Sequence, residues 1–248
     1  MKHEVLGIIP ARYKSSRFPG KPLTLLLAKP MVIWVAELTA KAIGKENTII
    51  ATDDNKIAQV VSDYDYKYIM TSENHFTGTD RLAEVANKID SKIYINVQGD
   101  EPTLNPDSIN KVIDEKMRNY DHVINAMTYL GNNEKPENPN IPKVVFNNAK
   151  EMVYMSRSPI PGYKSDKNKP EKYYKQVCIY AFNKNELTEY AKYGEKGSLE
   201  NYEDIEILRF LDLNIPIKMI EVEASSLAVD VKEDIINVEK RLEEIHNV

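Results

Sequence analysis

The feature that most constrains the fold is an alternation of strand-like and helix-like segments over the first 120 residues. Short apolar runs have the length of buried strands at residues 5–9, 48–52, 68–71 and 92–97. Apolar residues recur at helical spacing in 30–43, 56–63, 81–89 and the stretch that begins at Asn105-Pro106. Strands that alternate with helices predict an α/β fold, with a mostly parallel sheet covered on both faces.

The pattern changes after about Tyr120. Strand-like stretches with no helix between them follow at 122–129, 142–146, 152–156 and 176–182. The stretch 161–173, rich in Lys, Pro and Gly, predicts an exposed hairpin or loop. Helical periodicity returns at 186–192, 202–211 and 232–246. We therefore expect a single domain over 1–248, with an antiparallel insertion at about 120–182.

Composition excludes several classes of protein. A net charge of −5 disfavours a nucleic-acid binder, and no apolar run approaches the ~18 residues of a membrane span. Residues 1–4 lead straight into the first strand-like segment, so we expect no signal peptide. One cysteine, Cys178, and four scattered histidines offer no disulfide framework and no zinc spacing. We expect a cytoplasmic enzyme that binds neither nucleic acid nor membranes.

The loop after the first strand is strongly basic. No acidic residue occurs between Glu4 and Glu37, and the basic residues of that window are Arg12, Lys14, Arg17, Lys21 and Lys29. Ligands of open α/β sheets bind at the carboxyl ends of strands, where guanidinium and ammonium groups suit a polyphosphate. A merely solvated basic loop is the alternative, and the position after the first strand favours the phosphate site.

Two common nucleotide motifs do not match this loop. Gly20-Lys21 is followed by Pro22, where a P-loop needs a Ser or Thr that reaches magnesium. The glycine triplet of a dinucleotide-binding turn is also absent.

Carboxylates follow other predicted strands. Asp53-Asp54 and Asp100-Glu101 should reach the same sheet edge as the basic loop. A polyphosphate substrate requires magnesium, which takes one or two carboxylates plus phosphate oxygens. Asp100 is the leading ligand candidate, with a turn-forming role as its alternative. Spacing alone favours a helix cap for Asp230, with Glu233, over a metal ligand.

Longer motifs resemble one family over most of the chain, from about residue 4 to 242. They lie at 8–23, 51–54, 77–84, 96–102, 156–161 and 229–230. In this order they resemble the signatures of 3-deoxy-manno-octulosonate (Kdo) cytidylyltransferases, the CMP-Kdo synthetases. The resemblance implies a nucleotide-diphospho-sugar transferase fold, which is a Rossmann-like mixed sheet, and a homodimer joined through the insertion. It also implies transfer of CMP from CTP to a sugar acid, with release of pyrophosphate, in lipopolysaccharide or capsule biosynthesis.

The resemblance also implies roles for individual residues. Those matching nucleotide-binding positions are Pro10, Ala11, Arg12, Ser15, Arg17, Lys21, Gly78 and Arg81. Lys21, Arg12 and Asp100 would be catalytic, and Asp100 and Asp230 would hold Mg²⁺. Those matching the acceptor side are Gln98, Arg157, Gln176, Tyr180, Glu206 and Ile207.

The acceptor half departs from the family pattern. Gln176 stands where the family usually has His, and Ile207 stands where it usually has Gln. Val231-Lys232 also replaces a usual Thr-Pro. An apolar group in place of an amide leaves acceptor hydroxyls unpaired, so an acid other than plain Kdo is expected to be preferred. Two alternatives stay open: the same CTP chemistry on another small acid, such as a phosphonate, and a nucleotide-binding protein without catalysis.

Overall fold

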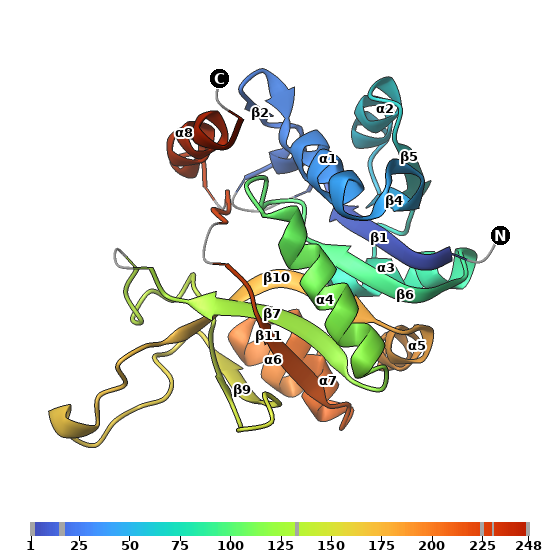
Figure 1. Ribbon diagram of the computed structural model, residues 1–248. Helices are drawn as coiled ribbons and strands as arrows, with labels where there is room; N and C mark the ends of the chain where they lie inside the picture. The colour runs from blue at the N-terminus through green and yellow to red at the C-terminus, as the bar shows by residue number, and fades with distance from the viewer. Residues whose placement is uncertain (1–2, 15–17, 132–133, 224–225, 230, 247–248) are drawn as a thin grey trace.

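The computed structural model describes residues 3–14, 18–131, 134–223, 226–229 and 231–246 (Figure 1). The central sheet of these residues has the strand order β11–β7–β10–β6–β1–β4–β5. The bounds of its strands are β1 (His3–Ala11), β4 (Thr48–Thr52), β5 (Lys67–Met70), β6 (Ser91–Val97), β7 (Val123–Tyr129), β10 (Tyr174–Phe182) and β11 (Ile217–Glu221). Neighbouring strands are parallel except β10, which runs antiparallel to both β6 and β7.

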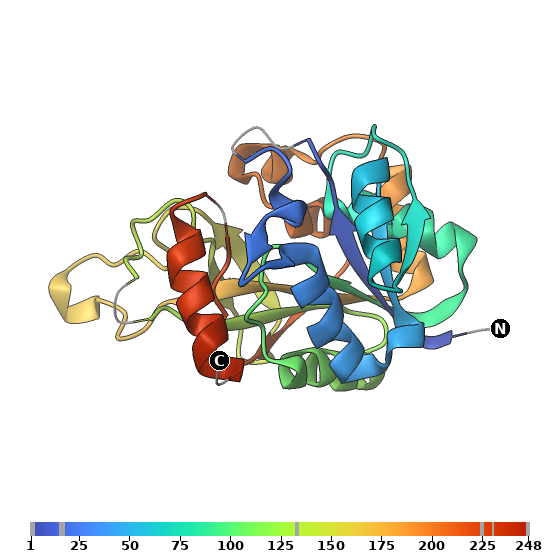
Figure 2. The same cartoon turned by 90° about the horizontal axis from the view of Figure 1, so that it is seen from above.

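Helices cover both faces of the sheet, as Figure 2 shows from above. Their bounds are α1 (Met31–Ile43), α2 (Asn55–Asp63), α3 (Gly78–Lys88), α4 (Pro106–Arg118), α5 (Lys184–Lys192), α6 (Ser198–Glu203), α7 (Arg209–Asp212) and α8 (Asp234–His246). Apolar residues of α1, α2 and α4 form one core with the sheet, and those of α3, α5 and α7 form another. Because both faces are buried, β1 and β4 are nearly continuous apolar runs. The expected mixed α/β class is confirmed.

The insertion adds strands β8 (Lys143–Phe146) and β9 (Met152–Ser156) beside β10. Both pairings are antiparallel, in line with the change of pattern after Tyr120. Residues 157–173 then form a long arm that extends away from the sheet (Figure 1). The arm's only regular element is a short 3-10 turn at Asp166–Asn168.

The last helix packs on the basic loop near the start of the chain. Val238 and Leu242 of α8 join a small core with Phe18, Leu26 and Trp34. Leu26 belongs to a short hairpin, β2 (Leu25–Leu26) and β3 (Lys29–Pro30), that follows the loop. This contact places α8 beside the hairpin, as Figure 2 shows, and the Leu27 amide donates a hydrogen bond to Glu239 of the helix.

Two parts of the sequence-based prediction differ from the structure. The helix expected at 202–211 is interrupted, because Asp204 has a φ of +50° between α6 and the 3-10 turn Glu206–Leu208. Asp204's carbonyl accepts a hydrogen bond from Arg157, a tertiary contact that periodicity does not reveal. Strand β11 was not expected, since it is short and follows Pro216.

No helix within the described ranges is both long and apolar enough to cross a bilayer.

Candidate active site

A cavity of about 710 Å³ opens at the carboxyl ends of β1 and β6. It is lined by most of the site residues expected from the sequence: Pro10, Ala11, Arg12, Lys21, Gly78, Arg81, Gln98, Asp100, Arg157, Gln176, Tyr180 and Glu206. These residues come from segments spread over almost 200 positions, and the sheet gathers them at one edge. The expected Ser15, Arg17 and Asp230 lie outside the described residues.

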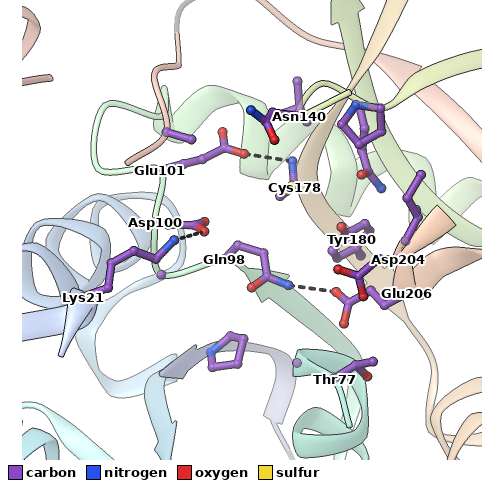
Figure 3. Close-up of a pocket in the computed structure, with 18 of the residues that line it drawn as sticks. Lys21, Thr77, Gln98, Asp100, Glu101, Asn140, Cys178, Tyr180, Asp204 and Glu206 are labelled. Carbon is purple, nitrogen blue, oxygen red and sulfur yellow. Dashed lines mark hydrogen bonds and ion pairs between the residues drawn. The ribbon is translucent and has the colours of Figure 1, made fainter. Parts of the chain in front are cut away.

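At one end of the cavity, Lys21 bridges two segments far apart in the sequence. Gly20, at a φ of +72°, turns the basic loop into the 3-10 turn that begins with Lys21. The Lys21 Nζ donates to Asp100 Oδ2 at 2.8 Å and to the carbonyl of Val229 at 2.9 Å (Figure 3). The Val229 amide in turn donates to the carbonyl of Asp100. This corner of the cavity therefore joins the first loop, the loop after β6 and the chain segment that precedes α8.

The two neighbouring carboxyl groups after β6 have different environments. The Asp100 side chain faces the cavity, is 29% exposed and forms an ion pair with Lys21. Glu101 is buried and accepts a hydrogen bond from the backbone amide of Cys178 in β10. Burial raises the pKa of Glu101. Asp100 is thus the carboxylate available to a cation, and Glu101 anchors the loop to the sheet.

The start of α3 forms the floor of the cavity. Thr77 and Asp80 make a capping box that fixes the first turn of the helix. A Cβ on Gly78 would lie 3.1 Å from the Gln98 amide nitrogen and 3.2 Å from Pro10 Cγ, so the close approach favours glycine. Arg81, nearly fully buried, donates to Asp53 Oδ2 at 3.1 Å and to the Thr71 hydroxyl. At Gly78, the start of the helix therefore borders the cavity with a residue that has no side chain.

A buried ion triad of Arg209, Glu200 and Asp80 supports the start of α3. The Arg209 guanidinium donates to both carboxylate oxygens of Glu200, at 2.6 and 2.8 Å. It also donates to Asp80 Oδ1 at 2.7 Å. Since Asp80 completes the capping box of α3, Arg209 ties the helix start to α6 and α7. Arg209 itself is fully buried.

Gln98 and Glu206 meet across the middle of the cavity. The Gln98 Nε2 donates to Glu206 Oε1 at 2.8 Å, and the backbone amide of Thr79 donates to Glu206 Oε2 at 3.0 Å (Figure 3). Burial raises the pKa of Glu206. The contact with Glu206 orients the side-chain amide of Gln98, which lines the cavity.

Arg157, at the far end, is held by backbone carbonyls. Its guanidinium donates to the carbonyls of Glu203, Pro139 (2.8 Å) and Asp204 (2.8 Å). Its own backbone amide donates to Glu203 Oε2 at 2.8 Å. A guanidinium has five N–H groups, so it can still bind a carboxylate while its position is fixed.

Gln176 is oriented by the sheet beneath it. The Asn125 amide nitrogen donates to the carbonyls of Val177 and Ile179, at the irregularity in the β7–β10 pairing. This leaves the Asn125 oxygen as acceptor, and Gln176 Nε2 donates to it at 3.1 Å. Gln176 therefore offers its amide oxygen, a hydrogen-bond acceptor, to the cavity.

Ile207 corrects one expectation from the sequence. It is 1% exposed, lies in the same core as Phe210, and is not among the lining residues. The Glu206–Leu208 turn directs Glu206 to the cavity and the following apolar side chain to the core. The expectation that Ile207 faces the acceptor is therefore wrong, and its exchange for the family's Gln does not reshape the site.

Sequence reasoning also missed several lining residues: Phe76, Asn138, Asn140, Lys175 and Lys196. The turn-rich stretch before β8 was a signal for the two asparagines, since such turns often carry binding groups. Nothing local distinguishes the two lysines from surface lysines, because only tertiary pairing with Glu134 and Asp204 places them.

The loop before α3 is fastened by Glu84. Its carboxylate receives hydrogen bonds from His75 (2.6 Å), the Ser72 amide (2.8 Å) and Lys88 (2.6 Å). Burial favours the neutral carboxyl, but these hydrogen bonds outweigh it and lower the pKa of Glu84 to about 2.

This depressed pKa predicts a pH-dependent contribution to stability. A carboxyl whose folded-state pKa is lowered stabilises the fold above its unfolded pKa, and the contribution is lost as pH falls towards the folded value. We expect Glu84→Gln to lower the free energy of unfolding at pH 7 by on the order of 2 kcal/mol, after allowance for partial exposure. Urea unfolding at pH 7, 5, 4 and 3 should show the gap to wild type closing below about 4.5, and a constant gap would contradict the assignment.

Comparison with known proteins identifies the family. A family model described as "Cytidylyltransferase" matches residues 6–218. The chain is 39% identical to the 3-deoxy-manno-octulosonate cytidylyltransferase of Trichlorobacter lovleyi, over 97% of this chain and 99% of that protein. The chain belongs to the 3-deoxy-manno-octulosonate cytidylyltransferase family. The relative from Escherichia coli is 37% identical, over 90% of this chain and 89% of that protein.

Solved structures agree with this membership. A CMP:2-keto-3-deoxy-manno-octonic acid synthetase complexed with CTP is similar with a TM-score of 0.89 and 35% identity, covering 98% of this chain and 99% of that chain. An inositol-1-phosphate CTP transferase from T. maritima, at 13% identity and a TM-score of 0.66, shares the fold. The chain is therefore an enzyme, a CTP-dependent nucleotidyltransferase that transfers CMP from CTP.

Proposed function

We propose that the enzyme transfers CMP from CTP to the hydroxyl of Kdo or a closely related ulosonic acid. The observation that carries the proposal is the shape of the cavity, which joins the Lys21–Asp100 corner to a polar end containing Gln98, Gln176 and Arg157. The first end suits a triphosphate, and the second suits a small hydroxylated acid. The product would feed lipopolysaccharide or capsule biosynthesis. A cytoplasmic location is proposed with it, because CTP belongs to the cytoplasmic nucleotide pool.

The residues support a mechanism of positioning and charge stabilisation. The acceptor hydroxyl attacks the α-phosphorus in line while the bond to pyrophosphate breaks. Lys21 and Arg12, which both line the cavity, offset charge on the phosphate oxygens. Gly78 and the Pro10-Ala11 backbone border the space for the cytidine. Gln98, which is hydrogen-bonded to Glu206, and Tyr180 of β10 would face the acceptor.

We propose Mg²⁺ as the cofactor, held by Asp100 and Asp230 together with phosphate oxygens. Asp100 fits this role because its carboxylate is partly exposed at the cavity and lies beside the phosphate-binding lysine. In the described part of the chain, no three acidic, His or Cys residues form a metal cluster. Two carboxylates would supply only part of the coordination of a magnesium ion, and phosphate oxygens and water would supply the rest. The bound ion would withdraw charge from the phosphates.

The proposal is tested by measuring pyrophosphate release from CTP with Mg²⁺ and a panel of acids. The panel contains Kdo, modified ulosonic acids and small phosphonates. The highest kcat/KM is expected for an ulosonic acid. Preference for a phosphonate would move the acceptor to another class, and CTP binding without pyrophosphate release on any acid would favour a non-catalytic role.

Gln176 and Ile207 are expected to behave differently in this assay. Gln176→Leu removes the amide oxygen that the cavity presents, so kcat/KM for the acceptor should fall about 10-fold, the value of one hydrogen bond. Ile207→Gln buries an unpaired amide in the core and should instead lower the free energy of unfolding by about 1–3 kcal/mol, with both KM values unchanged. A change of acceptor preference in Ile207→Gln would contradict its position in the core.

We further propose that the insertion joins two copies of the chain in a homodimer. Val153 of β9 is 61% exposed, and Tyr163 in the arm is also exposed. Apolar groups of this size on a projecting element suit contact with a second copy. Light scattering should give the mass of a dimer for the wild type and of a monomer for Val153→Asp, with Ile236→Asp on the exposed face of α8 as the control. A monomeric wild type would refute the proposal.

A further inference from the structure

Lys143, the first residue of β8, is a fully buried cation. Its Nζ donates to three backbone carbonyls: Asn138 at 2.9 Å, Ile141 at 2.6 Å, and Arg157. These three contacts use all the donors of the ammonium group. The site is thus built from main-chain groups of two separate segments.

No carboxylate in the described parts of the chain lies within ion-pair distance of this ammonium. Lys116 is also fully buried, but it differs because Glu186 lies 2.7 Å away. Removing a charge from water is costly unless its new partners are well placed. Lys143 therefore stabilises the fold only when its three carbonyl partners keep one arrangement. The ammonium group, by bonding to all three, fixes that arrangement.

The segments that Lys143 joins are walls of the cavity. Asn138, Asn140, Ile141 and Pro142 line it, and so does Arg157, which contacts the same loop through the Pro139 carbonyl. The carbonyls of Asn138 and Ile141 point to Lys143, while that of Pro139 accepts from Arg157. With these carbonyls directed away, the loop presents the Asn140 side chain to the cavity, above Cys178 (Figure 3).

The contacts of Lys143 belong to the acceptor end alone. The carbonyl of Pro142, which directly precedes Lys143, accepts a hydrogen bond from the backbone N–H of Gln176, so the same loop also supports that residue. The partners of Lys21 and the start of α3 are separate from this set. A change at Lys143 therefore affects residues 138–142 and Arg157 at the acceptor end of the cavity, and not the Lys21–Asp100 corner.

We propose that Lys143 is a positioning residue of the acceptor subsite, which fixes residues 138–142 and Arg157 so that Asn140 and the Arg157 guanidinium meet a small acidic acceptor. The inference rests on the proposed function for the identity of the acceptor. It adds Asn140 as an acceptor contact and Lys143 as the group that holds residues 138–142 and Arg157 in place.

The test compares Lys143→Met with a matched control, the double variant Lys116→Met with Glu186→Gln. The control removes a buried ammonium and its carbonyl contacts at a site outside the cavity, without leaving an unpaired carboxylate. For Lys143→Met we expect the acceptor KM to rise at least 10-fold while the CTP dissociation constant changes less than 2-fold. The control should keep both values near wild type. Equal effects of the two variants, or equal losses of CTP and acceptor affinity in Lys143→Met, would overturn the proposal.

Two further measurements keep the result interpretable. Lys143→Gln retains donors at the same position and should recover part of the acceptor affinity, so it replaces Lys143→Met if that variant does not fold. Hydrogen exchange of the CTP-bound enzyme should quicken at 138–142 and around Arg157 in the Lys143 variants only. The exchange measurement needs no acceptor: a wild type inactive on every acid tested would refute the proposed function, whereas unchanged exchange in the variants would refute the role of Lys143.

Discussion

Lys21→Ala is expected to lower kcat by at least ~10²-fold, the scale of losing one preorganised charge-stabilising group. The ammonium is held between Asp100 Oδ2 and the Val229 carbonyl, so it needs little reorganisation to meet the phosphates. Asp100→Ala should cause a loss of similar size, because it removes the proposed magnesium ligand and the partner that orients Lys21. Steady-state pyrophosphate release at saturating CTP and Mg²⁺ measures both effects.

Lys14→Ala is the matched control for Lys21. Lys14 lies in the same basic loop, but its side chain is 84% exposed and forms a surface ion pair with Glu73. Exposed ion pairs contribute little, so this variant should keep kcat within about 2-fold of wild type. Equal losses in Lys14→Ala and Lys21→Ala would mean that the loop acts through its overall charge, and wild-type turnover in Lys21→Ala would remove the assigned role.

Arg209→Met is expected to lower the free energy of unfolding by about 3–5 kcal/mol, the cost of breaking a buried ion group by removing one partner. The variant leaves the carboxylates of Asp80 and Glu200 buried without their cation. Because Asp80 caps α3, the floor at Gly78 should loosen and CTP affinity should fall as well. Urea denaturation and CTP titration measure the two effects.

Arg241→Met provides the comparison for Arg209. Arg241 lies on α8 and pairs with Glu244 three residues later, at the surface. Its loss should change the free energy of unfolding by less than about 1 kcal/mol. If both variants unfold at the same urea concentration, the buried triad does not hold the helix start in place.

The regular part of the fold was predictable because its signals are local. The strands Thr48–Thr52 and Met152–Ser156 have the bounds that their apolar runs indicate. Helix α1 was expected to within one residue, since its apolar face repeats at helical spacing. The break at Asp204 was not predictable, because the carbonyl contact that accompanies it comes from Arg157, 47 positions earlier.

The candidate site divides in the same way. The sequence by itself determined the family, the basic loop and the carboxylate after β6, because these are contiguous motifs beside strand ends. Only the tertiary structure decided that Ile207 is core and that Arg157 is held by carbonyls. It alone brought the Lys143 ammonium to the carbonyls of Asn138, Ile141 and Arg157. The physical reason is that burial and the direction of a hydrogen bond depend on segments brought together by packing, which no spacing along the chain records.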